Sequence, residues 1–249
     1  MQAIPKADLV EVFSSLQGEG VLTGARQVFL RFPDCNLDCN YCDTDFALKD
    51  GCRVEEVPAS GILSEWKNPI GIERISTLIQ HWQADYPRAH HSLSLTGGEP
   101  LLHTELLECW LPQLKGLLPL YLETNGTLPE QLKRIVEHLA WVSMDIKLHS
   151  LSGERTDWAT HRKFLETAIQ TQVFVKLVVS EETPDLELQL AGDLVAGISN
   201  KIPLILQPLT IANKPAVSSR HLLHMQAVAA DAHRNVRVIP QTHIFMMLA

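Results

Sequence analysis

The sequence lacks the features that would place the protein in a membrane or on a nucleic acid. All its apolar runs are shorter than the ~18 residues of a membrane-spanning helix. Positive charge is in the minority, since 21 Lys and Arg face 29 Asp and Glu, and the formal net charge is −8. That balance argues against a broad nucleic-acid-binding face. We therefore expect neither a membrane nor a nucleic acid among its partners.

The sequence also lacks a secretory pattern. The stretch MQAIPKADLVEVF (1–13) has no basic region followed by an apolar core, so we expect no signal peptide and a cytoplasmic location. There are only five cysteines, which in a cytosolic protein serve metal or redox chemistry more often than disulfides. Repeats and low-complexity tracts are absent as well. With 45% hydrophobic residues, the 249-residue chain can bury a sizeable core, and we expect a single domain over 1–249.

What the sequence does contain is a regular alternation of short apolar runs and amphipathic stretches. Alternation of this kind predicts strands that alternate with helices, and hence a parallel sheet. The expected strands are 27–32, 91–96, 118–124, 140–146, 173–179 and 202–207, with a seventh at 236–240. The expected helices are 71–82, 104–115, 129–139, 160–170, 184–199 and 218–233.

Unusual polar residues fall at the ends of these strands. In parallel βα folds the C-terminal strand edge forms the active face. Six strands that direct polar groups to one rim favour a partial (βα)6-type barrel, an α/β fold open on one side, with the active site at the C-terminal strand ends. Residues 47–70 look like an inserted loop with weak helical content. The polar groups are the cysteine loop (35–42), TGGEP (96–100), ETNG (123–126), Asp145, Lys147, Lys176 and Gln207.

Three cysteines lie within eight residues in FPDCNLDCNYCDTDF (32–46), with the spacing C-x3-C-x2-C. One interpretation is a structural zinc site, which would need a fourth ligand. A second is a disulfide plus a spare thiol, which the expected compartment disfavours. A third is a four-iron cluster held by three thiolates, with one iron open to a substrate or cofactor. The remaining cysteines, Cys52 and Cys109, stand alone and are expected to be plain thiols.

The cysteine spacing resembles that of the radical S-adenosylmethionine (SAM) enzymes. TGGEP follows the next strand, as the glycine-rich motif of that superfamily does, and Tyr41 places an aromatic residue before the last cysteine. Three further segments resemble one family within it, the 7-carboxy-7-deazaguanine synthases. They are SSLQGEG (14–20), CDT (42–44) and VRVIPQTHIFMMLA (236–249).

The resemblance implies a carbon–nitrogen lyase of queuosine and 7-deazapurine biosynthesis. The implied reaction contracts the ring of 6-carboxy-5,6,7,8-tetrahydropterin to 7-carboxy-7-deazaguanine and releases ammonia. The implied cofactors are a [4Fe-4S] cluster, SAM and Mg2+. A 5′-deoxyadenosyl radical takes a hydrogen from the substrate and later returns one, so SAM acts catalytically. The protein's own part is to orient these groups and exclude water.

The resemblance also assigns residues, one by one. Cys35, Cys39 and Cys42 would hold the cluster, and the hydroxyl of Thr44 would help to bind Mg2+, which prefers oxygen ligands. Without the family, an ordinary hydrogen-bonded loop turn explains Thr44 equally well. The residues expected along SAM are Tyr41, Cys42, Asp43, Gly98, Glu123, Asn125, Ser143, Asp145, Lys147 and Gln207. The residues expected around the pterin are Leu16, Gln17, Gly18, Glu19, Arg31, Thr96, His243 and Ala249.

The resemblance gives some of these residues and segments a more specific role. Glu19 is expected to accept hydrogen bonds from the pterin amino and ring N–H groups, and Arg31 to pair with the substrate carboxylate. The family often has Ser-Pro-Lys after the fourth strand, where this chain has SMDIK (143–147), so the choice between Asp145 and Lys147 stays open. Residues 149–162 are expected to be a solvated loop, and 236–249 to cap the substrate.

The family further implies a homodimer and an electron donor such as a flavodoxin or ferredoxin, for which 47–70 could be the docking surface. Two competing functions remain at this point. A glycyl-radical-enzyme activase would share the cluster loop and the partial barrel, but it must admit a protein loop and would not enclose a pterin. A zinc-stabilised binding module without catalysis would leave the polar strand ends unexplained.

Overall fold

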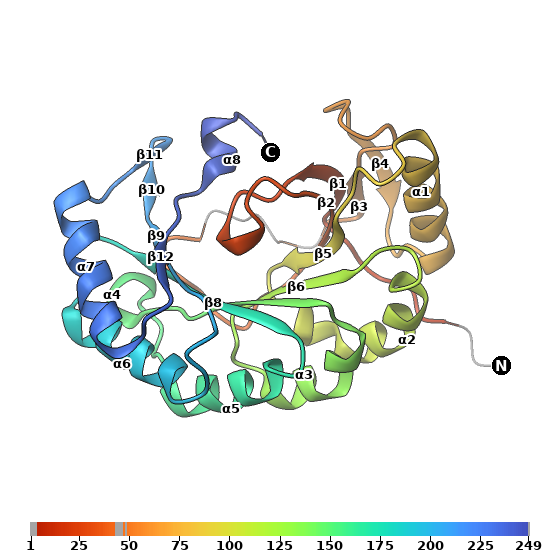
Figure 1. Cartoon of the computed structure of the whole chain (residues 1–249). Coiled ribbons are helices and arrows are strands. Elements are labelled where there is room, and N and C mark those ends of the chain that lie inside the picture. Colours follow the sequence, from red (N-terminus) through yellow and green to blue (C-terminus); the bar gives the residue numbers. More distant parts are fainter. Residues whose placement is uncertain (1–3, 43–46, 48, 249) are drawn as a thin grey trace.

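A curved sheet supports the whole molecule (Figure 1). The computed structural model describes residues 4–42, 47 and 49–248, and within them ten strands form one sheet, in the order β12-β9-β8-β7-β6-β5-β2-β1-β3-β4. Seven neighbouring strands run parallel, and all seven were predicted: β2 (Arg26–Phe32), β5 (Ser92–Gly97), β6 (Leu120–Thr124), β7 (Trp141–Asp145), β8 (Gln172–Val179), β9 (Leu204–Pro208) and β12 (Val236–Val238).

The other three strands extend the sheet beyond β2. β1 (Glu11–Leu16) is antiparallel to β2, β3 (Gly51–Val54) is parallel to β1, and β4 (Ser64–Lys67) returns antiparallel to β3. Two shorter strands, β10 (Thr210–Ile211) and β11 (Lys214–Pro215), pair only with each other.

Most of the helices cover the convex face of the sheet in Figure 1, whereas α8 lies on the open, concave side. They are α1 (Ile72–Asp85), α2 (Thr104–Leu114), α3 (Pro129–Ile135), α4 (His149–Ser152), α5 (Trp158–Ala168), α6 (Asp185–Ala196), α7 (Ser219–Ala232) and α8 (Thr242–Phe245). Short 3-10 turns lie at Gly20–Leu22, Pro100–His103 and Val136–His138. The open curvature confirms the predicted partial barrel.

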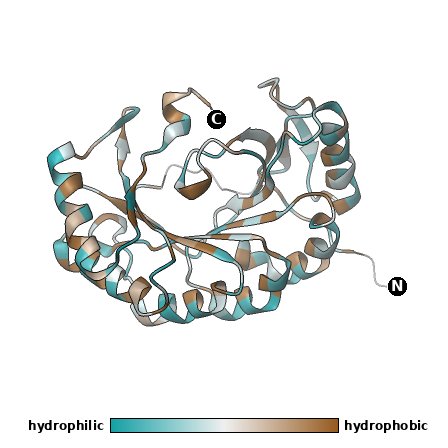
Figure 2. Cartoon of the chain, viewed as in Figure 1, coloured by the Kyte–Doolittle hydropathy of each residue, from teal (hydrophilic) through white to brown (hydrophobic). Residues whose placement is uncertain are grey.

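Local sequence explains where several of these helices begin. The Asp157 side chain accepts hydrogen bonds from the backbone N–H groups of Ala159 and Thr160, which caps α5. The Ser218 hydroxyl caps α7 in the same way, and α3 starts with Pro129, whose fixed φ suits a first helical residue. The helices carry both hydrophilic and hydrophobic residues (Figure 2), as helices with one buried face must.

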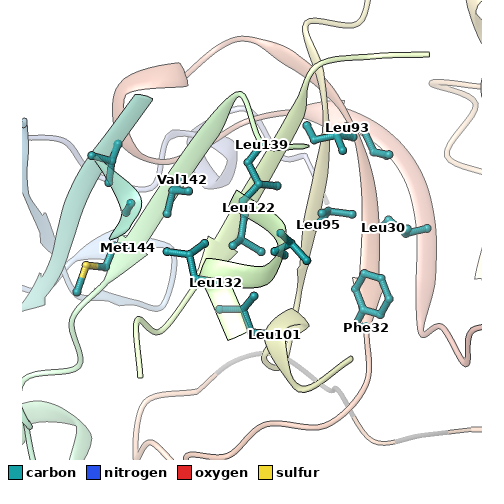
Figure 3. Packing of buried hydrophobic residues seen from close by; sticks show 14 of the residues in the cluster. Leu30, Phe32, Leu93, Leu95, Leu101, Leu122, Leu132, Leu139, Val142 and Met144 are labelled. Carbon is teal, nitrogen blue, oxygen red and sulfur yellow. The ribbon is translucent and has the colours of Figure 1, made fainter. Parts of the chain in front are cut away.

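Successive side chains of each parallel strand point to opposite faces of the sheet, so one set forms the core and the other set lines the site. One set of strand residues faces the helices and forms the apolar core, including Leu30, Leu95, Leu122 and Met144 (Figure 3). The intervening residues point to the concave face, because successive side chains of a strand alternate. That second set is largely polar, and it includes Arg31, Thr96, Glu123, Asp145, Lys176 and Gln207.

Two expectations about connecting segments were wrong. Within 47–70 we expected weak helical content, but β3 and β4 form there, because the alternate residues Cys52, Val54 and Trp66 can be buried against the core. Residues 149–162 were expected to be a solvated loop, yet they contain α4 and the first turn of α5. Ser152 and His161 are buried there, so the segment packs against the body of the protein.

Over the described residues, the structure has no helix of the length and apolarity that crossing a membrane requires.

Candidate active site

A polar pocket of about 560 Å³ opens on the concave face at the C-terminal ends of the parallel strands. It brings together every predicted site residue that the structure describes. These are Leu16, Gln17, Gly18, Glu19, Arg31, Cys35, Cys39, Tyr41, Cys42, Thr96, Gly98, Glu123, Asn125, Ser143, Asp145, Lys147, Gln207 and His243. The predicted residues Asp43, Thr44 and Ala249 lie outside the described residues.

Glu123, near the end of β6, organises one wall of this pocket. Its carboxylate accepts hydrogen bonds from Gln17 Nε2 at 2.7 Å and from Thr96 Oγ1 at 2.6 Å. Gln17 also donates to Gln27 Oε1 at 2.9 Å. These bonds join β6 and β5 to the segment after β1, and they fix the direction in which the acceptors of this wall point.

Glu19 organises the opposite wall. Its carboxylate pairs with the Lys176 ammonium and accepts hydrogen bonds from Gln207 Nε2 at 3.0 Å and Gln241 Nε2 at 2.8 Å. Burial by itself would raise the pKa of Glu19, but the Lys176 charge and these bonds outweigh it and lower that pKa to about 2. Glu19 is therefore a fixed anion in the lining of the pocket.

Lys176 connects Glu19 to a second carboxylate, Asp145. Lys176 Nζ lies 3.1 Å from Asp145 Oδ2, and Lys147 Nζ lies 2.7 Å from the same oxygen. Burial would lower the pKa of Lys176, but Asp145 and Glu19 raise it well above its ordinary value. Lys147 also lies over the Tyr41 ring, with 5.3 Å from Nζ to the centroid. The network thus reaches from Glu19 to the cysteine loop.

Two buried acceptors in this region have no hydrogen-bond partner among the described residues. They are Asp145 Oδ1 and Gln207 Oε1. A buried acceptor that is left unpaired costs free energy, so a ligand that brings hydroxyl or amino donors would satisfy them. Both residues were predicted to contact SAM, whose ribose hydroxyls and methionine amino group are donors of that kind.

The two glycines of TGGEP are required by close backbone packing. A Cβ on Gly98 would lie 1.7 Å from the carbonyl oxygen of Asp34, just before the cysteine loop. Gly97 has φ +128° and would meet the Phe32 carbonyl oxygen at 2.2 Å. Only glycine fits at either position, so the motif lies directly against the start of the cysteine loop.

Glu99 of the same motif ties the neighbouring strand end to it. Its carboxylate accepts from the backbone N–H groups of Leu101 and Asn125 and from the Thr124 hydroxyl, at 2.8 to 3.0 Å. Burial nevertheless raises its pKa to about 7. The sequence analysis assigned no role to Glu99, although its position within the TGGEP motif indicated that it lies close to the site.

The cysteine loop is held by a segment that sequence reasoning left without function. The backbone N–H of Asn40 donates to the Ser152 carbonyl at 3.0 Å, and that of Asp38 donates to Glu154 Oε1 at 2.9 Å. On the other side, Asn125 Nδ2 lies 4.0 Å from Cys35 Sγ. The C-terminal end of α4, Glu154 just beyond it and Asn125 just after β6 therefore position this loop between them.

The three thiols suit a cluster better than a single ion. Cys35 and Cys39 are free thiols, which excludes a disulfide within the loop. Among the described residues no three His, Cys, Asp or Glu side chains converge as the ligands of one metal ion, so a closed zinc site is not formed. In a four-iron cluster each thiolate binds a different iron, so the sulfurs need not converge.

The electrostatics of the loop also fit a cationic group. Burial is the largest cause of a raised pKa at both Cys35 and Cys39, and the pKa of Cys39 rises to about 11. The neighbouring cysteines raise both pKa values further. The protein by itself thus disfavours the thiolate forms of Cys35 and Cys39, and bound iron would supply the missing positive charge. The residues present therefore fit a [4Fe-4S] cluster.

A second charged group also lines the pocket. Glu11 on β1 pairs with Arg31 Nε at 2.9 Å and also with the Arg53 guanidinium of β3. Beside it, Phe13 and Phe29 stack with 5.0 Å between their ring centroids. Sequence reasoning missed Glu11 and Arg53, because only the strand pairing reveals that they share a row with Arg31.

The remaining cysteines and histidines stay outside the pocket. Cys52 is buried in the core, where burial raises the pKa of its thiol to about 12, and Cys109 is exposed on α2. His161 Nδ1 lies 3.1 Å from the Gly126 carbonyl, and His90 Nε2 lies 2.8 Å from Ser14 Oγ. Both histidines thus have partners within the fold, away from the pocket.

A comparison with known families finds that the profile described as the Radical SAM superfamily matches residues 30–175, more than half of the chain. Among curated proteins, the chain is similar to two named 7-carboxy-7-deazaguanine synthase. It is 46% identical to that of Geobacter sulfurreducens over 244 residues, covering 97% of this chain and 98% of the relative. It is 35% identical to that of Methanothermobacter thermautotrophicus, covering 96% of each.

Solved structures with a similar fold agree in architecture. QueE from Escherichia coli matches with a TM-score of 0.57 and 24% identity, over 96% of this chain and 95% of that one. Streptococcus suis SuiB bound to S-adenosylmethionine matches with a TM-score of 0.54 and 17% identity, over 87% of this chain and 49% of that one. At these identities the likeness concerns the fold alone.

Proposed function

Because the chain belongs to the radical SAM superfamily and, within it, to the family of 7-carboxy-7-deazaguanine synthases, we propose that it makes 7-carboxy-7-deazaguanine. The substrate is 6-carboxy-5,6,7,8-tetrahydropterin, and the ring contraction releases ammonia within queuosine and 7-deazapurine biosynthesis. One observation carries the proposal: the predicted cluster, SAM and pterin residues that the structure describes all line a single pocket.

In this proposal Cys35, Cys39 and Cys42 hold the [4Fe-4S] cluster. When bound, the cluster and SAM supply the radical that starts the reaction. The chain's own residues have a different task, which is to hold the loop and to keep water out. Ser152 and Glu154 fix the backbone of the loop, and Gly98 allows the next strand end to approach it closely.

SAM then lies between the cysteine loop and the strand ends. The residues proposed to contact it are Tyr41, Cys42, Asp43, Gly98, Glu123, Asn125, Ser143, Asp145, Lys147 and Gln207. The unpaired acceptors Asp145 Oδ1 and Gln207 Oε1 support this placement. Lys147 donates a hydrogen bond to Asp145, so the two side chains would meet SAM as a pair, and the choice between them stays open.

The pterin occupies the part of the pocket between Glu19 and Glu123. A pterin presents an amino group and ring N–H donors, and both carboxylates are acceptors held in place by several bonds. Leu16, Gln17, Gly18, Thr96, His243 and Ala249 would complete its surroundings. Arg31 would take the carboxylate, since a guanidinium can donate two parallel hydrogen bonds to it.

Thr44, which lies outside the described residues, would help to hold Mg2+, and the ion would also bind the substrate carboxylate.

The proposal also covers the organisation of the protein. Residues 1–249 form one domain, the protein is a cytoplasmic homodimer, and a flavodoxin or ferredoxin is its electron donor. For that donor, residues 47–70 offer a docking surface, and 236–249 cap the substrate. The contact of the Thr242 backbone N–H with the Gly18 carbonyl at 2.8 Å supports the cap.

The test is an anaerobic turnover assay on the reconstituted full-length protein. It contains dithionite, SAM, Mg2+ and 6-carboxy-5,6,7,8-tetrahydropterin, and mass spectrometry follows 7-carboxy-7-deazaguanine. We expect product from the wild type, none from Cys39→Ala, and a full amount from Cys109→Ala, which removes a thiol far from the pocket. Thr44→Ala should lower the rate and raise the Mg2+ concentration that is needed.

Other outcomes would separate the alternatives. An iron-loaded protein that cleaves SAM but makes no product would support membership of the radical SAM superfamily and would refute the proposed substrate. A colourless protein that binds zinc through the three cysteines would refute the cluster.

A further inference from the structure

Three charged residues form a row across three neighbouring strands in the lining of the pocket. Glu11 on β1 is in register with Arg31 on β2 and with Arg53 on β3. Residues in register on neighbouring strands point to the same face, and all three line the pocket. We call these residues, Arg31, Glu11 and Arg53, the charge row.

The pairing within the charge row leaves one positive charge. Glu11 binds Arg31 through Nε, and the other oxygen of its carboxylate pairs with Arg53. The Arg31 guanidinium keeps further N–H donors on its Nη atoms. Without Arg53, the pair of Glu11 and Arg31 would be neutral, and Glu11 would repel a carboxylate that approached Arg31. With Arg53 present, the row has a formal charge of +1.

On the basis of the proposed function, we propose that Arg53 is a positioning and specificity residue that acts through Glu11. Arg53 neutralises Glu11, so that Arg31 can bind the carboxylate of the pterin with its full positive charge. Glu11 in turn keeps the Arg31 side chain aimed along the pocket wall. The charge row therefore selects a carboxylated pterin over a pterin that lacks this group.

The fold holds Arg53 in position for this role. Its neighbours along β3, Cys52 and Val54, are fully buried and anchor the strand to the core. Arg53 therefore points to the opposite face, toward the pocket, because side chains alternate along a strand. Its side chain is 53% exposed, against 21% for Arg31 and 15% for Glu11, so it forms the solvent side of the row. A charge at this place acts on an entering anion before that anion is bound.

The test compares three variants of the reconstituted holoenzyme. Arg53→Gln lowers the formal charge of the row from +1 to 0, and the double variant Glu11→Gln/Arg53→Gln returns it to +1. Gln at position 11 can still accept a hydrogen bond from Arg31. Lys67→Gln on β4 is the matched control, because it removes one exposed positive charge from the same strand pair but not from the pocket.

Turnover supplies the first measurement. For Arg53→Gln we expect the KM for 6-carboxy-5,6,7,8-tetrahydropterin to rise roughly fivefold to tenfold at low salt, the range expected for a charge at a pocket rim. At saturating substrate, kcat should stay near the wild-type value. The double variant should recover most of the lost affinity, and Lys67→Gln should leave KM unchanged. Thermal unfolding and SAM cleavage without substrate confirm that each variant is intact.

Binding supplies a second measurement that does not depend on turnover. Fluorescence titration with 6-carboxypterin and with pterin, in the presence of SAM, gives the preference for the carboxylate. Arg53→Gln should reduce this preference, and the double variant should restore it. If the double variant binds as weakly as Arg53→Gln, Arg53 contacts the ligand itself and the proposed action through Glu11 is wrong. An unchanged KM and preference in Arg53→Gln would also overturn it.

A failure of the proposed function would look different. In that case the wild type itself would show no preference for 6-carboxypterin over pterin and would form no 7-carboxy-7-deazaguanine.

Discussion

Two ion-paired groups line the same pocket but differ in burial. The network around Lys176 joins Glu19 and Asp145, and its lysine side chain is only 10% exposed. The charge row ends in Arg53, which is about half exposed. Removal of the partner of a buried charge costs a large part of the folding free energy, whereas an exposed charge is screened by water and salt. The first group therefore fixes the geometry of the pocket, and the second sets the charge that a substrate meets.

The strongest test of this contrast is Lys176→Met. Removal of the ammonium takes the shared partner from Glu19 and Asp145, two partly buried carboxylates, of which Asp145 keeps Lys147. We expect the free energy of unfolding to fall by about 3–5 kcal/mol, measured by denaturant titration of the protein without cofactors. Lys163→Met, at an exposed position of α5, is the control. A loss below about 1 kcal/mol would show that the burial of this network contributes little.

A second test uses pH and the carboxylate of Glu99, which forms no ion pair with the residues that the structure describes. Burial raises the pKa of Glu99 to about 7, so the folded protein binds this proton more tightly than the unfolded chain does. The contribution of Glu99 is therefore fully present below about pH 4.5 and is lost as pH rises through 7. Over that range it amounts to roughly 3 kcal/mol of unfolding free energy.

Glu99→Gln should remove this pH dependence. Because Gln is neutral at every pH, the stability curves of the two proteins should lie close together near pH 5 and separate as pH rises to 8, with the variant the more stable. Glu105→Gln, near the start of α2, should run parallel to the wild type. Parallel curves for Glu99→Gln would mean that the three hydrogen bonds to Glu99 cancel the effect of burial.

The third test measures the stability of the charge row rather than its effect on substrate. Arg53→Gln should lower the free energy of unfolding by less than about 1 kcal/mol, because Arg53 is half exposed. Thermal unfolding at low and high salt checks this. A loss as large as that of Lys176→Met would erase the distinction between the two groups.

The smallest effect is expected at a pair on the outer surface. Arg134 binds Glu108 through two hydrogen bonds, at 2.8 and 2.6 Å, but both side chains are exposed. Arg134→Ala should leave the thermal unfolding midpoint unchanged at physiological salt, despite the good geometry. A clear shift there would show that hydrogen-bond geometry matters more than burial in this protein.

The parallel part of the fold was predictable because each strand carries its own local signal. The runs at 173–179 and 202–207 are apolar and β-branched, and helices with regular apolar spacing separate them. The three strands beyond β2 have no such signal. β3 and β4 are four residues each and include charged side chains, so only their pairing with β1 and with each other makes them strands.

The site was predictable to the extent that it follows strand ends and motifs. Glu123 and Asp145 end predicted strands, and Gly98 lies in a motif. The partners of these residues were not predictable, because contacts such as Lys176 with Glu19 join positions 157 apart in the sequence. Arg53 was missed for the same reason, since its pairing with Glu11 depends on a strand register that no local pattern specifies.

The bond between Gln241 and Glu19 has a consequence for the time at which the pocket forms. It spans 222 positions, so one side of the site is synthesised long before its partner. The βα units between them can fold in sequence as they emerge, because neighbours from β5 to β9 follow chain order. Until Gln241 has emerged, a nascent chain thus holds the parallel strands of the barrel but lacks one of the bonds that hold Glu19 in the pocket.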